Sequence, residues 1–483
     1  MTRRKINLWS KKLLIPFALL VVAIPIGILL LYLWGGWGKA DEKSTLVPKE
    51  RVVVQQTGGV PGTEVGTGWS TKENPAEAIT EAVRMALEGK KYRVPDLAII
   101  FATSGSDLRS ILSKTQELLG EKTMVFGGTS DSRAVMTNKG FVRATQRAYE
   151  QALMEGKRGL ALMTIKSKDI VFGVGSASFS DYRSPREASR AAALAALKKA
   201  GKSPEEKPRA ALVTITIGSE EEAIGGIEEV LGKSTPILGG TAGGPALGVF
   251  GEKGIYDEGI SLAVIYTDLP VGWTFEGGFD PVEARSGVVT KVNGQAIVEI
   301  DHRPALDVYN EWLDGKIDRL YKEIGKPDVI RDLLTLNPLY RKYVSSNRQT
   351  FFLFSHPWPK DSTLRDRSIM TSTRIKAGER IYLSRGTWET LLNRIGKLPR
   401  MAKTDRGLDP QVEPVLGIAF VCGGVLGAIP DTERDKMPVL INHATNGVPF
   451  IANFTWGEQG HFPGIGSKHG NLLTSFIFIA GKK

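Results

Sequence analysis

The sequence has almost no cysteine, and several common catalytic motifs are missing from it. Among 483 residues there is a single cysteine, Cys422, which excludes an internal disulfide and leaves the redox compartment open. A Gly-x-Ser-x-Gly nucleophile motif is absent. No Walker loop or dinucleotide-binding glycine motif stands between a strand and a helix. These absences point away from serine hydrolases and from the common nucleotide-binding enzymes.

The sequence also lacks a dense basic run with interleaved aromatic residues. The formal net charge is +11, but the first twelve residues alone carry five basic side chains and no acidic one. In the rest of the chain acidic and basic residues are mixed throughout. A nucleic-acid partner is therefore not expected.

One long apolar segment is present, and it lies near the N-terminus. Residues 13–34 read LLIPFALLVVAIPIGILLLYLW without a charged side chain, and about 20 such residues suffice to cross a bilayer as a helix. The positive charges precede the segment, so we expect a cytoplasmic N-terminus at 1–12, a single-pass membrane anchor at 13–34 and a linker at 35–63. Because Gly38-Lys39-Ala40 fits a cleavage site, a signal peptide is the alternative. Both interpretations place the bulk of the chain outside the cytoplasm, in the periplasm or the extracellular space.

An internal repeat organises the first half of the chain. Residues 98–130 align without a gap with residues 210–242. Each copy reads as a buried strand, a helix that ends at a glycine, and a short strand that runs into Gly-Gly-Thr. A helix with a capping residue and proline at its first position precedes each copy, after Asn74 and after Ser184.

This pattern predicts a mixed α/β fold. Two strand–helix units, at about 64–173 and 174–281, are expected to form one pseudo-symmetric body over 64–281. A C-terminal α+β domain is expected at 282–483. The Gly-Gly-Thr segments allow two interpretations, a tight bend at the end of a strand or a ligand-facing loop at the carboxyl edge of the sheet.

Further segments carry a resemblance to a known family. They are VTKVNGQAIVEIDHRPALDVYNEWL at 289–313, FTWGEQG at 454–460 and KHGNLLTSFIFI at 468–479. Together with the two Gly-Gly-Thr strand ends, they resemble the FIST domain proteins, with an N-terminal half at 64–281 and a C-terminal half at 282–483. The resemblance implies a sensory role in signal transduction, with a small and possibly amino-acid-like ligand. It implies no catalytic mechanism.

The resemblance also implies where a ligand lies and how the signal leaves. FIST proteins usually work beside an output module, and this sequence contains no kinase, cyclase or chemoreceptor segment, so a separate signalling partner protein is expected. The family tends to carry Cys-x-Gly-Arg where this chain has Cys422-Gly423-Gly424-Val425, so a guanidinium partner for a ligand carboxylate is missing.

We expect a ligand cleft where the duplicated half meets the C-terminal half, without a cofactor, a metal ion or a catalytic residue. The candidate ligand-binding residues are Gly127, Gly128, Thr129, Gly239, Gly240, Thr241, Cys422, Gly457, Glu458, His469 and Asn471.

Three alternatives stay open. The first is an extracytoplasmic hydrolase or transferase that uses Cys422 or a histidine; His443 or His469 could activate Cys422, although a buried cysteine is commonly inert. The second is a metal site of Glu458, His461 and His469, whose loop spacing is a weak signal. The third is an interaction module without a small ligand.

Overall fold

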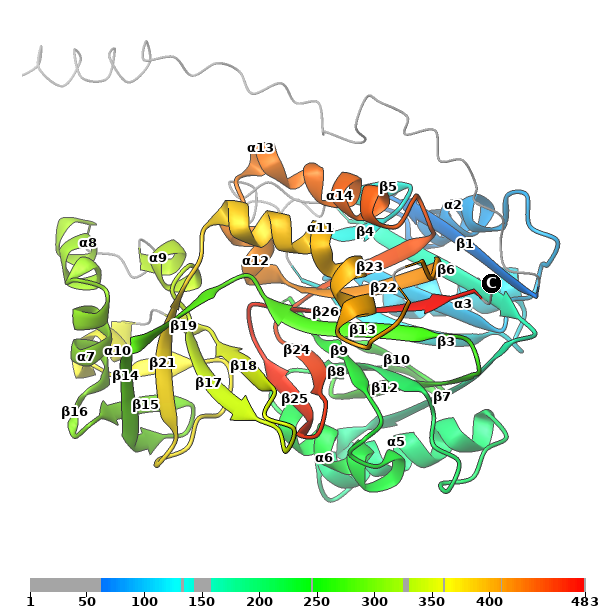
Figure 1. The fold of residues 1–483 in the computed structure, drawn as a ribbon. Helices are drawn as coiled ribbons and strands as arrows, with labels where there is room; N and C mark the ends of the chain where they lie inside the picture. Colours follow the sequence, from blue (N-terminus) through cyan, green and yellow to red (C-terminus); the bar gives the residue numbers. More distant parts are fainter. Residues whose placement is uncertain are drawn as a thin grey trace, which may run out of the picture. The chain divides into compact units, whose positions relative to one another are not determined.

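The structure is a computed structural model, and it describes residues 62–131, 134–142, 158–244, 246–324, 330–358, 361–409 and 411–481. The predicted cytoplasmic N-terminus, membrane anchor and most of the linker lie outside these residues. None of the helices in the described ranges combines the length and the hydropathy of a membrane span. The described chain has a mixed α/β fold with four β-sheets (Figure 1).

The two predicted copies have the same order of elements. The first comprises β1 (Thr63–Ser70), α2 (Pro75–Leu87), β2 (Leu97–Thr103), α3 (Leu108–Leu119), β3 (Met124–Ser130), β4 (Val135–Thr137), β5 (Gly140–Val142) and β6 (Leu160–Ser167). The second comprises β7 (Ile170–Ser178), η1 (Phe179–Asp181), α5 (Pro185–Lys199), β8 (Ala210–Thr216), α6 (Glu220–Leu231), β9 (Ile237–Ala242), β10 (Val249–Gly251), β11 (Gly254–Tyr256) and β12 (Gly259–Thr267). Their strands lie in the equivalent orders β1-β6-β2-β3 and β7-β12-β8-β9. The predicted caps are present, because Asn74 accepts the backbone N–H groups at the start of α2 and Ser184 does so for α5.

A third unit with the same strand order differs from the expected C-terminal α+β domain. It comprises β13 (Val271–Gly277), α11 (Trp388–Thr404), β22 (Pro414–Cys422), α12 (Gly423–Ala428), α13 (Asp431–Arg434), α14 (Lys436–Ala444), β23 (Phe450–Thr455), β24 (Glu458–Phe462), β25 (Gly466–Gly470) and β26 (Leu473–Ala480). Its strands lie in the order β13-β26-β22-β23, and β22 and β23 are parallel, like β2 with β3 and β8 with β9. The body therefore has three pseudo-equivalent units rather than two.

An insertion separates the first strand of the third unit from its first helix. It comprises β14 (Asp280–Asn293), β15 (Ala296–Ile300), β16 (Arg303–Pro304), α7 (Ala305–Trp312), α8 (Lys316–Ile324), α9 (Arg331–Thr335), β17 (Leu339–Val344), β18 (Thr350–Ser355), β19 (Pro357–Trp358), α10 (Asp361–Asp366), β20 (Ile369–Thr371) and β21 (Arg380–Arg385). These strands form the fourth sheet, which has its own apolar core. The predicted hairpin at Asn293-Gly294 joins β14 and β15.

The three units exchange hairpins in a cycle. The β4–β5 hairpin of the first unit pairs with β23, the β10–β11 hairpin of the second unit pairs with β3, and the β24–β25 hairpin of the third unit pairs with β9. The registers place Val135, Val249 and Glu458 at equivalent positions, opposite Asn453, Gly128 and Gly240 respectively. Each of the three sheets is thus completed by strands from another unit.

The inner faces of the three sheets share one apolar core, and helices cover the outer faces. Phe101 of β2, Leu212 of β8 and Phe420 of β22 belong to the same buried cluster, in which the rings of Phe101 and Phe420 meet edge to face at 5.7 Å. Three separate clusters hold α2 and α3, α5 and α6, and α11 and α14 against their sheets. This packing directs the carboxyl ends of the parallel strand pairs toward a common region.

Candidate functional site

The loops that follow β3, β9 and β23 meet at one end of the body. Gly243 packs so closely that a Cβ there would overlap the side chain of Asp131 and contact Trp456. A Cβ on Gly244 would overlap Ser104. We call this region, formed by Ser104, Asp131, Gly243, Gly244 and Trp456, the strand-end pole. Ligands of open α/β sheets bind at such carboxyl ends of strands, so a ligand site is expected near the strand-end pole.

The two Gly-Gly-Thr segments lie close to this pole but make different contacts. A Cβ on Gly127 would overlap the carbonyl oxygen of Ile100, and a Cβ on Gly239 would overlap that of Val213, so both first glycines permit close backbone packing. The hydroxyl of Thr129 accepts a hydrogen bond from the backbone N–H of Gly248 at 3.2 Å. Gly127, Gly128 and Thr129 thus serve the packing of β3 against its neighbours.

The second segment belongs to a polar network. Thr241 Oγ1 donates to Glu220 Oε1 at 3.1 Å and accepts from Gln459 Nε2 at 3.1 Å. A Cβ on Gly240 would overlap the side chain of Thr455. The sequence predicted Gly239, Gly240 and Thr241 as site residues, and the structure brings Thr241 together with two partners that were not predicted, Glu220 and Gln459.

Glu458 is a carboxyl group in the protein interior, at the position where the other two units have Val135 and Val249. Its Oε1 lies 2.7 Å from Thr455 Oγ1, and its Oε2 accepts the backbone N–H of Leu473 at 3.2 Å. Burial raises the pKa of Glu458 to about 8, although the bonds to Thr455 and Leu473 and the charge of His469 oppose this change. The group is therefore largely protonated at neutral pH.

Cys422 ends β22 and is buried beside Glu458. Strand pairing makes it equivalent to Thr103 and Thr216 of the other units. Burial, together with the neighbouring carboxyl of Glu458, raises the pKa of the Cys422 thiol. Since the thiolate is the nucleophilic form, this environment opposes nucleophilic chemistry at Cys422.

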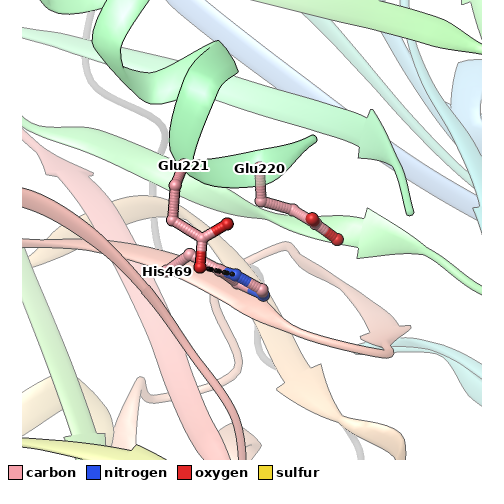
Figure 2. Close-up of side chains that lie close together, drawn as sticks. All are labelled: Glu220, Glu221 and His469. Carbon is pink, nitrogen blue, oxygen red and sulfur yellow. Dashed lines mark hydrogen bonds and ion pairs between the residues drawn. The ribbon is translucent and has the colours of Figure 1, made fainter. Parts of the chain in front are cut away.

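A second cluster joins the start of α6 to β25. Nδ1 of His469 lies 3.3 Å from Oε1 of Glu221, and the His469 side chain is 3% exposed while that of Glu221 is 47% exposed. Glu220 is buried, and its Oε2 accepts the backbone N–H of Gly218 at 3.0 Å. One nitrogen or oxygen atom of each of the three side chains lies within 4.8 Å of the other two. Figure 2 shows the carboxyl group of Glu221 directed at the imidazole and the side chain of Glu220 lying beside it.

The charges of this cluster reinforce one another. Burial lowers the pKa of His469, but the charge of Glu220 and the hydrogen bond and charge of Glu221 outweigh this effect, and the net pKa is raised. Burial also disfavours the charged form of Glu221, but its hydrogen bond to His469 and the imidazolium charge lower its pKa to about 2. The backbone N–H of Arg374, from the insertion, reaches Glu221 Oε1 at 3.4 Å. Elements of the second unit, the third unit and the insertion therefore meet here.

The two predicted residues Glu458 and His469 lie on opposite faces of the β24–β25 hairpin. Successive strand residues alternate between faces, so Glu458 faces Thr455 and Cys422 while Gln459 faces Thr241. His469 is the cross-strand partner of Gln459 and shares its face. His461, from the weak metal pattern, bonds to Ser467 at 3.1 Å instead, so the structure does not assemble Glu458, His461 and His469 as one site.

Several buried polar atoms of this region have no hydrogen-bond partner among the described residues. They include Nε2 of His469, Oε1 of Gln459 and Oδ1 of Asn471. Asn471 Nδ2 donates to the carbonyl oxygen of Trp456 at 3.0 Å. A Cβ on Gly457 would overlap His469 Nε2, so only a glycine backbone fits against this buried nitrogen. Buried polar groups without partners are rare in native proteins, and an ordered water or a bound ligand commonly accounts for them.

A second set of such atoms lies deeper, on the inner faces of the sheets. Asn453 and Ser475 are the two strand neighbours of Phe420, and Thr214 is the cross-strand partner of Ser261. Both side-chain atoms of Asn453 and the hydroxyls of the other three residues have no partner in the described structure. The only sequence signal for them is a polar residue inside an otherwise apolar strand.

One surface hollow lies away from these residues. A groove of about 550 Å³ beside α2 is lined by Lys72, Ala76, Glu77, Thr80, Glu81, Arg84 and Lys114. It contains no predicted site residue and none of the unpartnered buried atoms. We therefore base the candidate site on His469, Gln459 and Asn471, of which Asn471 donates to the Trp456 carbonyl of the strand-end pole.

Comparisons with known proteins give a family match and weak structural matches. Residues 61–303 match the FIST N domain, and residues 305–461 match the FIST C domain. No curated protein matches the chain with significance.

The solved structures that resemble the chain do so at low similarity. A cyanuric acid hydrolase from A. caulinodans is 9% identical with a TM-score of 0.29, and the match covers 87% of this chain and 100% of that one. Another cyanuric acid hydrolase structure is 8% identical with a TM-score of 0.30, over 87% and 100% of the two chains. The PurLQS structure from Thermotoga maritima is 12% identical with a TM-score of 0.20, over 88% and 74%. Superpositions this poor carry no argument about function.

Proposed function

The chain belongs to the FIST family, and from this premise we propose that it is a sensory protein that binds a small metabolite at the strand-end pole. FIST domains are associated with sensory and ligand-binding signalling. The proposal includes a membrane anchor at residues 13–34, an extracytoplasmic location for the bulk of the chain and a separate signalling partner. The apolar run and the charges that precede it support the anchor.

One observation carries the proposal of a ligand site. In the described structure, three buried polar atoms have no hydrogen-bond partner: His469 Nε2, Gln459 Oε1 and Asn471 Oδ1. The side chains of His469 and Asn471 lie against the backbone of Gly457, and Gln459 donates to Thr241. An imidazole Nε2–H donates to a carboxylate or carbonyl oxygen, and amide oxygens accept from an amine. This combination suits a small molecule with both groups, such as an amino acid. Recognition then needs no arginine at Val425.

A ligand screen tests this function. An amino-acid and metabolite library added to the full-length chain is expected to contain a compound that raises the melting temperature. A ligand at about 100 times its Kd stabilises the native state by roughly 2.7 kcal/mol. His469→Gln is expected to weaken the response at least tenfold, because it removes the Nε2–H donor. The matched control is His461→Gln, whose imidazole bonds to Ser467.

The screen can also contradict the proposal. If no compound shifts the melting temperature, or if His461→Gln weakens the response as much as His469→Gln, the ligand site is not the one proposed. A protein that responds to no small molecule would then fit an interaction module better.

A substitution at Cys422 separates the sensory proposal from a cysteine hydrolase or transferase. Cys422→Ala is expected to keep the ligand-induced shift in melting temperature, because the raised pKa of the thiol and its position beside Glu458 give it no role in recognition. The measurement is the same thermal titration. Loss of a measurable turnover in Cys422→Ala, with the fold intact by circular dichroism, would instead support the enzyme.

A further inference from the structure

We propose that Glu220, Glu221 and His469 bind a divalent transition-metal ion at the start of α6. The inference deepens the proposed function and rests on it, because the ion would lie beside the proposed metabolite. It assigns to these side chains a ligand that the sequence did not indicate, since only strand pairing brings His469 to α6. The ion itself is identified by the chemistry of the donor atoms.

The separation of the donor atoms fits direct coordination. Metal bonds to imidazole nitrogen and carboxylate oxygen are about 2.0–2.2 Å long, so two ligands of a tetrahedral ion lie roughly 3.4 Å apart. Nδ1 of His469 and Oε1 of Glu221 are 3.3 Å apart, and an oxygen of Glu220 completes a set within 4.8 Å. One imidazole and two carboxylates suit Zn²⁺ or Mn²⁺. Three protein ligands leave a coordination position open, and the exposed part of Glu221 gives access from solvent.

The surrounding residues hold these ligands in place, which is common around metal sites. Glu220 accepts hydrogen bonds from the Gly218 backbone and from Thr241, and Thr241 in turn accepts from Gln459. Gln459 is completely buried, yet its Oε1 has no partner among the described residues. This atom belongs to the amide that is held beside Glu220 by Thr241. The chain of hydrogen bonds from Gln459 through Thr241 thus connects this buried amide to Glu220, one of the three proposed ligands.

The charge balance supports the same conclusion. Acidic residues in the first turn of a helix are ordinarily stabilised by the helix dipole alone, and that explanation suffices for the exposed Glu222. It does not explain why Glu220 is buried, because a buried carboxylate is costly unless it is paired. Within the described residues, neither Glu220 nor Glu221 pairs with a lysine or an arginine. A divalent ion would supply positive charge opposite these two carboxyl groups.

Coordination through Nδ1 also bears on the proposed ligand site. A metal ion on Nδ1 leaves the proton of a neutral imidazole on Nε2, so that this nitrogen is a hydrogen-bond donor. Nε2 is the atom beside Gly457 that has no partner among the described residues. The ion would thus set the protonation state of the atom that is proposed to hold the metabolite.

Metal titration tests the inference. The full-length chain is treated with a chelator and titrated by calorimetry with Zn²⁺ or Mn²⁺ alone. We expect one equivalent to bind and the melting temperature to rise by several degrees, with reversal by EDTA. Glu221→Gln and Glu220→Gln are expected to lower the affinity at least tenfold. Glu222→Gln, one residue further along the same turn, is the matched control and is expected to bind like the wild type.

Each other outcome has a defined meaning. Absence of saturable binding, or equal loss in Glu222→Gln and Glu221→Gln, would overturn the metal site. Since Glu221 is half exposed, Glu221→Gln is expected to fold, and its melting temperature in EDTA checks this. If no metal ion binds but a metabolite binds equally well with and without EDTA, the metal site is wrong and the proposed sensory function stands. An ion that binds while no metabolite does would preserve the metal site alone.

Discussion

Glu458→Gln is expected to stabilise the protein at alkaline pH and to remove most of the pH dependence of its unfolding between pH 5 and 9. Burial raises the pKa of Glu458 from the ordinary value of 4.5 to about 8. The folded state therefore retains a proton that the unfolded state releases. The stability that this proton contributes is complete below about pH 4.5 and is lost as the pH rises through about 8.

The amide is a suitable replacement for the protonated carboxyl. Thr455 Oγ1 can donate to the carbonyl oxygen of Val421, which is 3.3 Å away, and then accepts from the amide nitrogen of the introduced glutamine side chain. The amide oxygen keeps the hydrogen bond from the Leu473 backbone. A shift of one pKa unit corresponds to about 1.4 kcal/mol. The free energy of unfolding of the variant is thus expected to exceed that of the wild type by a few kcal/mol at pH 9 and to match it at pH 5.

Urea unfolding at pH 5, 7 and 9 measures this difference. The raised pKa of His469 also costs stability as the pH rises, so some pH dependence is expected to remain in the variant. Glu222→Gln, on the surface, serves as the control and should follow the wild type. Parallel curves for wild type and Glu458→Gln would show that Glu458 is ionised in the folded state.

Gly127→Ala is expected to destabilise the fold on the order of 3 kcal/mol. Gly127 has a φ of 132°, which residues with a side chain rarely adopt. The added methyl would overlap the carbonyl oxygen of Ile100 on the neighbouring strand β2. A backbone atom of a central strand cannot move aside without disturbing the sheet.

Chemical denaturation of the variant, monitored by circular dichroism, gives the free energy of unfolding. Gly427→Ala is the matched control, because Gly427 lies in α12 and a Cβ there meets no atom within 4 Å. The control is expected to be neutral or slightly stabilising. If the two variants unfold within about 0.5 kcal/mol of each other, a spread typical of harmless substitutions, the first glycine of this segment has no packing role.

The sequence predicted the first two units well because their repeat contains no gap. The third unit was missed for two physical reasons. The insertion over 280–385 separates β13 from α11, and the strand end of β23 reads Ala452-Asn453-Phe454 instead of Gly-Gly-Thr. The strand order and the exchanged hairpin survive without these residues, because a sheet requires backbone pairing and an apolar inner face rather than a particular sequence.

Of the residues in the proposed site, Thr241, Glu458, His469 and Asn471 were identified from the motifs, and their role in binding stays a prediction. Glu220, Glu221 and Gln459 were not identified. Two glutamates in the first turn of a helix have an ordinary explanation in the helix dipole, and their partner His469 is brought to them only by the pairing of β24 with β9. Contacts over such distances in the chain leave no local pattern.

The cyclic exchange of hairpins has a consequence for synthesis on the ribosome. His469 and Glu221 are separated by 248 positions in the chain. The second unit therefore emerges with an open sheet edge beside β9 and waits for the β24–β25 hairpin, which is made almost last. Domains that fold as they emerge can bury their surfaces early. Here the cyclic exchange of hairpins is complete only when the whole chain has been synthesised. A truncated nascent chain would thus lack Glu458 and His469 and the second unit's closing hairpin, so that the proposed ligand site forms only together with the final strands.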